Sequence, residues 1–425
     1  MPPKKPKVLF LAYYFPPLNA GACVRTWNIA KYLSRLGWDV TVVTPDPHLW
    51  RLRDISEIEK INLELNKEGI KCIHTGHDWR FLSPGCLKFE NSGIKWFLGG
   101  VGRRIASKWR LEREIGWIKE AKRTCSTLGK EDVDIILASG SPFCSFGLAK
   151  WLSDKLNRPY VLDYRDPWTG NPHAQYPKPQ KTINEEKELL QSSAAVTIVS
   201  PSWAMDLTRR YGLKEKIHVI SNGFDPDEMS QVQPTHFPHF AIVYTGDFYP
   251  PKRVITPFME ALKHLKELRG KEKGKWCLYY YGQMGEHVRE EAERLGMTDE
   301  VKLQGKVHRN VALSAVAGAN ISIVITSIPD DVTIADKGMI TCKVFESLGL
   351  KTPILLICPL GSDVAILEQC KGVRAFQKNN IVGMASYLNE RIESQGERIE
   401  GEDPYSWVNL SKQLNDILLK KSLVE

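Results

Sequence analysis

"LFLAYYFPPLNAGACVRTWNIAKYL" (residues 9–33) is the stretch from which the fold can be read. An apolar run ends in two aromatic residues and two prolines, and a loop with one glycine leads into an amphipathic helix from about Val24. This is the order of a strand, a phosphate-binding turn and a helix. It matches neither GxGxxG nor GxxxxGK[ST]. Gly21 at the helix start either brings the backbone close to an anion or makes a simple tight turn.

The same alternation of apolar strand and helix continues along the chain, which is typical of a doubly wound parallel sheet. We expect the first series of strands in the runs at 7–15, 39–45, 70–76, 133–140, 160–166, 194–200 and 217–223. A second series follows at 240–248, 276–282, 301–307, 321–327 and 352–358. The Pro- and Asp-rich stretch between the two series is typical of a hinge.

The fold class predicted is therefore α/β, with two Rossmann-like domains facing a central cleft. The predicted domains are 1–222 and 223–404, with a last helix in 405–425 that could pack on either domain. Ligands of such sheets bind beyond the carboxyl ends of the strands. We expect the site in the cleft.

Composition limits the possible partners. Residues 1–130 contain 23 Lys or Arg and 12 Asp or Glu, so the net charge of +8 is concentrated in the N-terminal portion. Such a portion could meet an anionic membrane, nucleic acid or a phosphorylated acceptor. The nine cysteines form no CxxC pair, which favours a reducing, cytoplasmic location and no zinc site. No apolar run is long enough for a membrane span.

Three motifs of the first domain lie where strands end. The fourth strand ends in "SGSPF", in which Ser141 precedes a proline that suits a helix start, so plain capping is favoured there. The fifth ends in "LDYRDPW" with Asp163, Arg165 and Asp166. Charged residues at the end of an apolar strand are costly to bury, which favours a functional role. The alternative is an internal Asp–Arg pair that orders the loop.

Two motifs of the second domain suggest an anion site. In "YTGDFYPPKR", Gly246 ends a strand and Lys252 and Arg253 precede the next helix, so they could clamp a diphosphate or be a solvated basic pair. In "KVFESLG", Lys343 and Glu346 share a helix face. Glu346 could accept hydrogen bonds from a ribose diol, or the two could form a surface ion pair.

Four stretches together resemble the group-1 glycosyltransferases of the GT-B fold, the retaining family-4 kind: "YYFPPLNAGACVRTWNIAKYLSRLGWDVTVVT", "ISNGFD", "YTGDFYPPKR" and "KVFESLGLKTPILLI". The resemblance spans nearly the whole chain, and it implies that the last helix crosses back to the first domain. It also implies a nucleotide-sugar donor on the second domain and an acceptor on the first.

The resemblance assigns roles to single residues. Glu346 matches the glutamate that binds the ribose, and Lys252 or Arg253 matches the basic residue at the diphosphate. Gly21 matches the glycine of the loop that closes over the phosphates. Gly305 to Val307 lies where the family's backbone contacts the base.

The chain also departs from the family. The family's glutamate eight residues before Glu346 is Gly338 here, so Lys343 or the backbone near Gly338 would serve the sugar instead. Ala20 precedes Gly21 where many members have a second glycine, and Asp247 replaces an arginine. Arg165-Asp166 replaces a histidine.

The function expected is transfer of a sugar from a nucleotide-diphosphate donor to a hydroxyl of a glycan or lipid-linked saccharide of a cell-surface polysaccharide pathway. No metal and no cofactor are expected, and the outcome expected is retention. Asp166 is the candidate for orienting the acceptor, with Ser141, Asp163 and Arg165 on the acceptor side. A nucleotide-sugar epimerase and a non-catalytic nucleotide-sugar-binding paralogue remain alternatives.

The segment 95–123 carries nine basic and three acidic residues, with Trp96, Phe97, Val101, Ile105 and Trp109 at roughly helical spacing. Such a helix is typical of peripheral contact with an anionic membrane, here the inner face. A surface helix that buries one face on the sheet fits equally well. Nucleic acid is not an expected partner because no recognised module is present.

Overall fold

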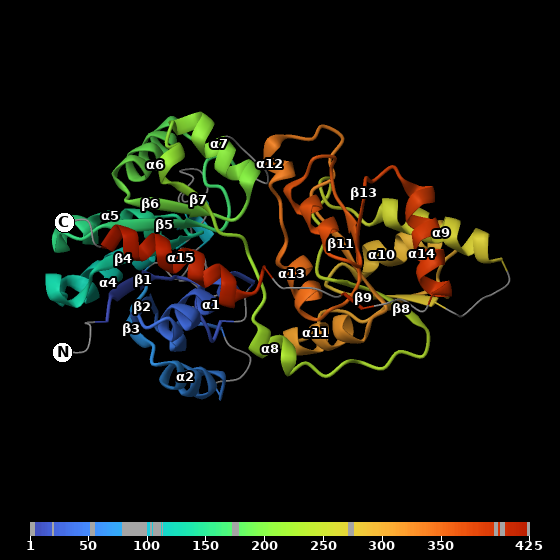
Figure 1. The fold of residues 1–425 in the computed structure, drawn as a ribbon, viewed down its shortest axis with the longest axis horizontal. Coiled ribbons are helices and arrows are strands. Elements are labelled where there is room, and N and C mark those ends of the chain that lie inside the picture. The colour runs from blue at the N-terminus through green and yellow to red at the C-terminus, as the bar shows by residue number, and fades with distance from the viewer. Residues whose placement is uncertain are drawn as a thin grey trace. The chain divides into compact units, whose positions relative to one another are not determined.

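The structure is a computed structural model that describes residues 5–18, 21–51, 56–78, 100–102, 104, 112, 114–171, 178–270, 276–394, 398–399 and 404–422. The chain forms two compact units (Figure 1). Unit 1 consists of Met1–Val199, Leu207–Ile220 and Trp407–Glu425. Unit 2 consists of Ser200–Asp206 and Ser221–Ser406.

Unit 1 is built on a parallel sheet of order β3-β2-β1-β4-β5-β6-β7. In chain order its strands are β1 (Lys7–Leu11), β2 (Asp39–Pro45), β3 (Lys71–Thr75), β4 (Ile135–Gly140), β5 (Tyr160–Tyr164), β6 (Ala195–Ile198) and β7 (Ile217–Val219). Its helices are α1 (Gly21–Arg35), α2 (Ser56–Glu68), α4 (Gly116–Thr124), α5 (Cys144–Leu156), α6 (Gln180–Ser192) and α15 (Trp407–Ser422), and α7 (Pro201–Tyr211) ends in it. β4 and β5 are buried along their whole length, as expected for central strands covered on both faces.

The C-terminal helix α15 packs on α1 and β4 (Figure 1). Its residues Trp407, Leu410, Leu414 and Leu418 are buried in the same hydrophobic cluster as the first strand. A hydrogen bond from Trp38 Nε1 to Asn415 Oδ1, at 2.8 Å, ties it to the start of β2. The helical spacing of these apolar residues explains why the helix docks on this face.

Unit 2 is built on a parallel sheet of order β10-β9-β8-β11-β12-β13. Its strands are β8 (Phe240–Thr245), β9 (Trp276–Tyr281), β10 (Val301–Leu303), β11 (Ile321–Ile325), β12 (Ile354–Ile357) and β13 (Val373–Phe376). Its helices are α8 (Pro226–Ser230), α9 (Thr256–Arg269), α10 (Gly285–Arg294), α11 (Arg309–Gly318), α12 (Ile334–Lys337), α13 (Cys342–Gly349) and α14 (Ile381–Glu393).

Both sheets therefore have the doubly wound order. Strands are added first on one side of the unit's first strand and then on its other side, so the strand order reverses there. This reversal lies between β1 and β4 in unit 1 and between β8 and β11 in unit 2. The predicted α/β class with two Rossmann-like sheets is confirmed. In unit 2, the loops after β8 and β11 are the ones that the reversal leaves open for a ligand.

Candidate active site

The loop after β8 brings the backbone of unit 2 unusually close to a lysine side chain. Gly246 has φ +95°, and its N–H donates to the Tyr281 carbonyl at 2.6 Å. A Cβ at this position would overlap the Lys343 ammonium, and a Cβ on Gly282 would lie 2.5 Å from the Gly246 carbonyl oxygen. The positive φ therefore requires glycine at position 246, and the Gly246 carbonyl leaves no space for a side chain at position 282.

Arg253 and Lys343, which we call the cation pair, form no ion pair with a described residue. Arg253 is only 8% exposed, its Nε finds no hydrogen-bond acceptor among the described residues, and its guanidinium lies 5.3 Å from the centre of the Tyr249 ring. The Lys343 ammonium lies 5.2 Å from the centre of the Tyr244 ring, and no described residue accepts a hydrogen bond from it or forms an ion pair with it. A buried and a half-buried cation, neither of them in an ion pair with a described residue, are typical of a site whose ligand supplies the negative charge.

The electrostatics of Lys343 support this interpretation. Burial, and then the nearby charge of Arg253, lower the pKa of Lys343 to about 8. The carboxylates of Glu346 and Asp247 act in the opposite direction but do not restore the usual value. An anion bound between Arg253 and Lys343 would relieve both the repulsion and the loss of hydration.

Lys252 is not part of the cation pair, although the sequence placed it beside Arg253. Its ammonium pairs with Asp336 Oδ1 at 2.8 Å, and Asp336 is fully buried. Asp336 also accepts hydrogen bonds from Ser327 Oγ at 2.6 Å and from the Thr333 backbone N–H at 3.0 Å. Burial works against ionisation, but these donors keep the pKa of Asp336 below its usual value. Lys252 therefore anchors α12 to the loop that carries Arg253.

Glu346 is held by an arginine that the sequence analysis did not single out. Arg309, at the start of α11, pairs through Nη1 with Glu346 Oε1. The same guanidinium donates to both oxygens of Glu228 from Nε and Nη2, each at 3.1 Å. The two carboxylates raise the pKa of Arg309, even though burial opposes them. Glu346 thus pairs with Arg309 and not with Lys343, which lies on the same helix.

The remaining residues predicted to lie on the donor side follow β10. Gly305 has φ +70° and open space where a side chain would be. Val307 is half-buried against the hydrophobic cluster that includes Tyr279. Lys306, between these two residues, is exposed. The contact of this loop with a base stays a prediction.

Gly338 has a physical reason to be glycine. A Cβ there would lie 2.5 Å from Trp203 Nε1 and 2.8 Å from Ser200 Oγ. Trp203 is fixed by a hydrogen bond from Nε1 to the Ala335 carbonyl at 2.8 Å. No side chain, and hence no carboxylate, fits at Gly338.

Asp163 in unit 1 lies in a buried network rather than at an open surface. Its carboxylate is 1% exposed and pairs with Arg25 Nη2 at 2.6 Å. Ser139 Oγ and Thr197 Oγ1 donate to it at 3.0 and 2.7 Å. Arg25 also donates to the Ile220 carbonyl at 3.1 Å. The geometry favours the alternative in which Asp163 forms an internal ion pair, and its partner is Arg25 rather than Arg165.

The other acceptor-side residues lie at the carboxyl ends of β4 and β5. Arg165 Nε pairs with Asp166 Oδ2 at 3.1 Å, and Asp166 is 44% exposed. Ser141 is half-buried. Glu112, which the sequence analysis missed, accepts hydrogen bonds from the backbone N–H groups of Phe143 and Cys144 at 2.9 and 2.6 Å. It caps α5, and burial raises its pKa even though these bonds lower it.

In unit 1, Gly21 begins α1 with open space around it, but Asn19 and Ala20 lie outside the described residues.

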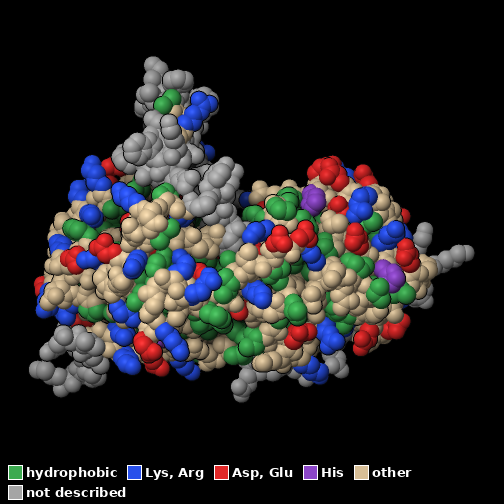
Figure 2. All heavy atoms as spheres, turned by 90° about the horizontal axis from the view of Figure 1, so that it is seen from above, with side chains coloured by type: hydrophobic (Ala, Val, Ile, Leu, Met, Phe, Trp, Pro, Cys, Tyr) green, Lys and Arg blue, Asp and Glu red, His purple; other side chains and the backbone are tan. Residues whose placement is uncertain are grey.

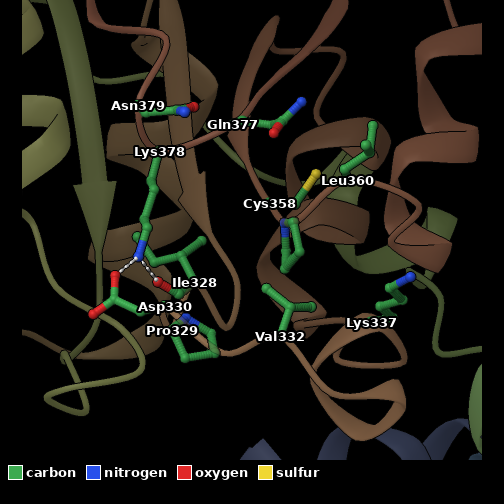
Figure 3. Close-up of a pocket in the computed structure, with 11 residues that line it drawn as sticks. Ile328, Pro329, Asp330, Val332, Lys337, Cys358, Leu360, Gln377, Lys378 and Asn379 are labelled. Atoms are coloured by element: carbon green, nitrogen blue, oxygen red, sulfur yellow. Dashed lines mark hydrogen bonds and ion pairs between the residues drawn. The ribbon is translucent and has the colours of Figure 1, made fainter.

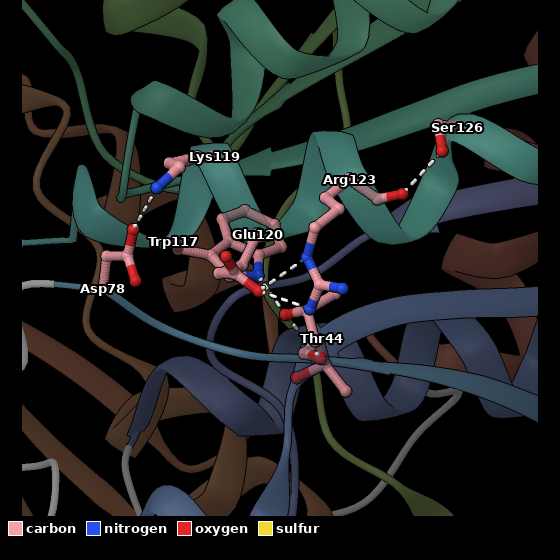
Figure 4. Close-up of polar contacts among 8 residues, drawn as sticks. Thr44, Asp78, Trp117, Lys119, Glu120, Arg123 and Ser126 are labelled. Carbon is pink, nitrogen blue, oxygen red and sulfur yellow. Dashed lines mark hydrogen bonds and ion pairs between the residues drawn. The ribbon is translucent and has the colours of Figure 1, made fainter.

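About half of the basic segment 95–123 also lies outside the described residues, including Trp96, Phe97, Ile105 and Trp109. Its described end is α4, whose Trp117 is buried and donates to Thr75 Oγ1 at 2.7 Å (Figure 4). The charged face of α4 carries ion pairs of Lys119 with Asp78 and of Arg123 with Glu120 (Figure 4). On the face drawn in Figure 2, described Lys and Arg side chains are interspersed with Asp and Glu. The membrane contact stays a prediction.

Within the described residues, no helix is long and apolar enough to cross a membrane, and no group of three or more His, Cys, Asp or Glu side chains is placed to hold a metal ion.

Residues 20–228 match the model of Glycosyltransferase Family 4. No curated protein sequence matches the chain.

Several solved structures are similar to this chain over nearly its whole length. HepE from Anabaena in complex with UDP is 15% identical, with 97% of this chain and 100% of that chain covered and a TM-score of 0.60. Sucrose-phosphate synthase from Thermosynechococcus elongatus is 12% identical, with 98% and 99% covered and a TM-score of 0.61. A glycosyltransferase from Rickettsia africae is 16% identical, with 98% and 94% covered and a TM-score of 0.53. These findings confirm the predicted resemblance to group-1 glycosyltransferases of the GT-B fold.

Proposed function

We propose that the chain transfers a sugar from a nucleotide-diphosphate donor to a hydroxyl acceptor, and that the diphosphate binds at the cation pair. The observation that carries this proposal is the pair itself: Arg253 is buried with Nε unsatisfied, and Lys343 has no acceptor among the described residues. A diphosphate supplies the negative charge and the acceptor oxygens that both side chains lack. The UDP and UDP-glucose complexes of HepE support a nucleotide-sugar donor.

The donor would lie along the carboxyl edge of unit 2. Its base would meet the backbone from Gly305 to Val307, after β10. Its ribose would bind Glu346, which the ion pair with Arg309 holds in place. Gly246 would let the backbone approach the diphosphate, because its φ of +95° and lack of a side chain leave the required space.

The reaction proposed is a retaining transfer without a metal ion. As the sugar–phosphate bond breaks, negative charge builds up on the leaving diphosphate. Arg253 and Lys343 are fixed close to where that charge develops, which is the arrangement that lowers such a barrier. Asp166, half-exposed beside Arg165, would orient the acceptor hydroxyl. Gly21 would bring the start of α1 to the phosphates.

For the acceptor we propose a glycan or a lipid-linked saccharide of a cell-surface polysaccharide pathway. The enzyme would work in the cytoplasm, with the basic segment 95–123 as its contact to the inner face of the membrane. The net positive charge of the N-terminal portion supports this location of the acceptor. Sedimentation with anionic and neutral vesicles tests the contact, and no binding to anionic vesicles would contradict it.

The proposal is tested by incubating the protein with UDP-, GDP- and ADP-sugars and a panel of acceptors while following nucleoside diphosphate release. We expect turnover with one donor class and a loss of roughly a hundredfold in kcat in Arg253→Ala and Lys343→Met, as for removal of one charge-stabilising donor. Lys263→Ala is the matched control, since this lysine lies on α9 and is 50% exposed. Circular dichroism of each variant excludes unfolding as the cause.

Turnover like that of the wild type in both cation-pair variants would refute the site. Binding of a nucleotide-sugar without turnover on any acceptor would instead favour the non-catalytic paralogue. The observation that favours the non-catalytic paralogue is that Gly338 leaves no room for a carboxylate side chain.

A further inference from the structure

A cavity of about 360 Å³ lies at the carboxyl ends of β11, β12 and β13 in unit 2 (Figure 3). Its volume is in the range of small-molecule sites. Cys358, Val332 and Leu360 form an apolar part of the lining, and its polar groups are two ammonium groups, two amides and the carboxylate of Asp330 (Figure 3). The residues that line it are Ile328, Pro329, Asp330, Val332, Lys337, Cys358, Pro359, Leu360, Gln377, Lys378 and Asn379.

Two lysines of this cavity are available to a ligand. Lys337, at the end of α12, is half-buried, and no described residue accepts a hydrogen bond from its ammonium or forms an ion pair with it. Lys378 pairs with Asp330 at 2.5 Å and donates to the Ile328 carbonyl at 3.2 Å (Figure 3). Asp330 is 99% exposed, so this pair contributes little and is easily exchanged for a better-placed anion.

Along the order of strands in the sheet of unit 2, the cavity lies on the β11 side of the cation pair. β10 and β9 lie on one side of β8, and β11, β12 and β13 lie on the other. A donor with its base after β10 and its diphosphate after β8 must therefore extend its sugar toward the ends of β11 to β13. The cavity wall is joined to the loop of the cation pair, because the Ile328 N–H donates to the Lys252 carbonyl at 2.6 Å.

The chemistry of the cavity selects among sugars. Asp330 is the one acidic residue of the lining, and at 99% exposure its charge stays screened by solvent when Lys378 turns to a ligand. Gly338, next to Lys337, has no room for a carboxylate that would repel an anion. The apolar side formed by Val332, Leu360 and Cys358 suits the C–H face of a sugar ring, whereas the ammonium groups suit a negative substituent.

We propose that this cavity receives the transferred sugar, and that Lys337 and Lys378 bind an acidic substituent, a carboxylate, on it. The donor class is then a nucleoside diphosphate linked to a uronic acid. This inference rests on the proposed function, since it takes the diphosphate at Arg253 and Lys343 as its reference.

The test compares matched pairs of donors that differ only in the carboxylate: UDP-glucose with UDP-glucuronate, and GDP-mannose with GDP-mannuronate. Titration calorimetry gives the dissociation constants for the wild type, Lys337→Ala, Lys378→Ala and the control Lys263→Ala. We expect the acidic member of one pair to bind roughly tenfold more tightly to the wild type, as for a hydrogen bond to a charged group. That preference should fall toward unity in Lys337→Ala and persist in Lys263→Ala.

Lys337→Arg keeps the charge and should keep the preference, which separates a binding role from a loss of folding. Equal binding of both members to the wild type, or a preference that Lys337→Ala and Lys378→Ala leave unchanged, would overturn the inference. If these donors still bind in a manner that depends on Arg253, the proposed function survives such a result. If no nucleotide-sugar binds at all, the proposed function fails first, and the inference with it.

Discussion

The lowered pKa of Lys343 makes a quantitative prediction about how binding of a nucleoside diphosphate depends on pH. Burial and the charge of Arg253 bring the pKa of Lys343 to about 8 in the free protein. If only the ammonium form clamps the diphosphate, the apparent dissociation constant rises as the protonated fraction falls, which makes binding roughly tenfold weaker at about pH 9 than at about pH 7. The carboxylates of Glu346 and Asp247 face the same group and act in the opposite direction, toward a higher pKa of Lys343.

Titration calorimetry with UDP and GDP between these pH values measures the effect. Lys343→Gln should bind more weakly at neutral pH and show no such dependence. Cys342→Ser removes a neighbouring thiol whose charge acts on Lys343, and it should keep the wild-type profile. A dissociation constant that stays flat in the wild type, or that rises equally in Lys343→Gln, would refute the reasoning.

Three further predictions concern stability. Asp163→Asn leaves Arg25 buried without its counter-charge and should cost about 3–5 kcal/mol in urea unfolding; a cost below about 1 kcal/mol would show that the ion pair is not what holds this part of unit 1. Gly338→Ala should cost about 1–3 kcal/mol by overpacking against Trp203, and Trp203→Ala in the same chain should recover part of it; additive costs would contradict the contact. Lys343→Met should raise the thermal midpoint at neutral pH, since the folded chain disfavours this charge, and the gain should shrink as pH rises above the lowered pKa of about 8.

The strand pattern could be predicted because buried parallel strands are continuous apolar runs. The run at 39–45 coincides with β2, Asp39–Pro45. The predicted strand at 7–15 is longer than β1, Lys7–Leu11. Tyr13 and Phe15 lie beyond the strand but are buried, so they extend the apolar run from which the strand was predicted. β13, Val373–Phe376, was missed, since it is short and carries an exposed arginine within it.

The candidate site could be predicted only in part, because sequence shows which charges are close along the chain and not which ones neutralise each other. Lys252 and Arg253 are neighbours in sequence, yet Asp336 pairs with the first and leaves the second unsatisfied. Asp163 pairs with Arg25, which is far away in the chain.

The sequence does not indicate that Arg309 holds Glu346, because the two residues lie on different helices. The cavity residues Lys337 and Lys378 likewise come together only through the ends of separate elements.

The central claim is that Arg253 and Lys343 bind the diphosphate of the donor. Calorimetric titration of uridine against UDP, and of guanosine against GDP, tests it most directly, because each pair differs only in the diphosphate. The account predicts that one diphosphate binds the wild type far more tightly than its nucleoside, and that Arg253→Ala weakens it by roughly tenfold to a hundredfold while Lys263→Ala does not. Equal binding of nucleoside and diphosphate, or equal binding of the diphosphate to both variants, would contradict it.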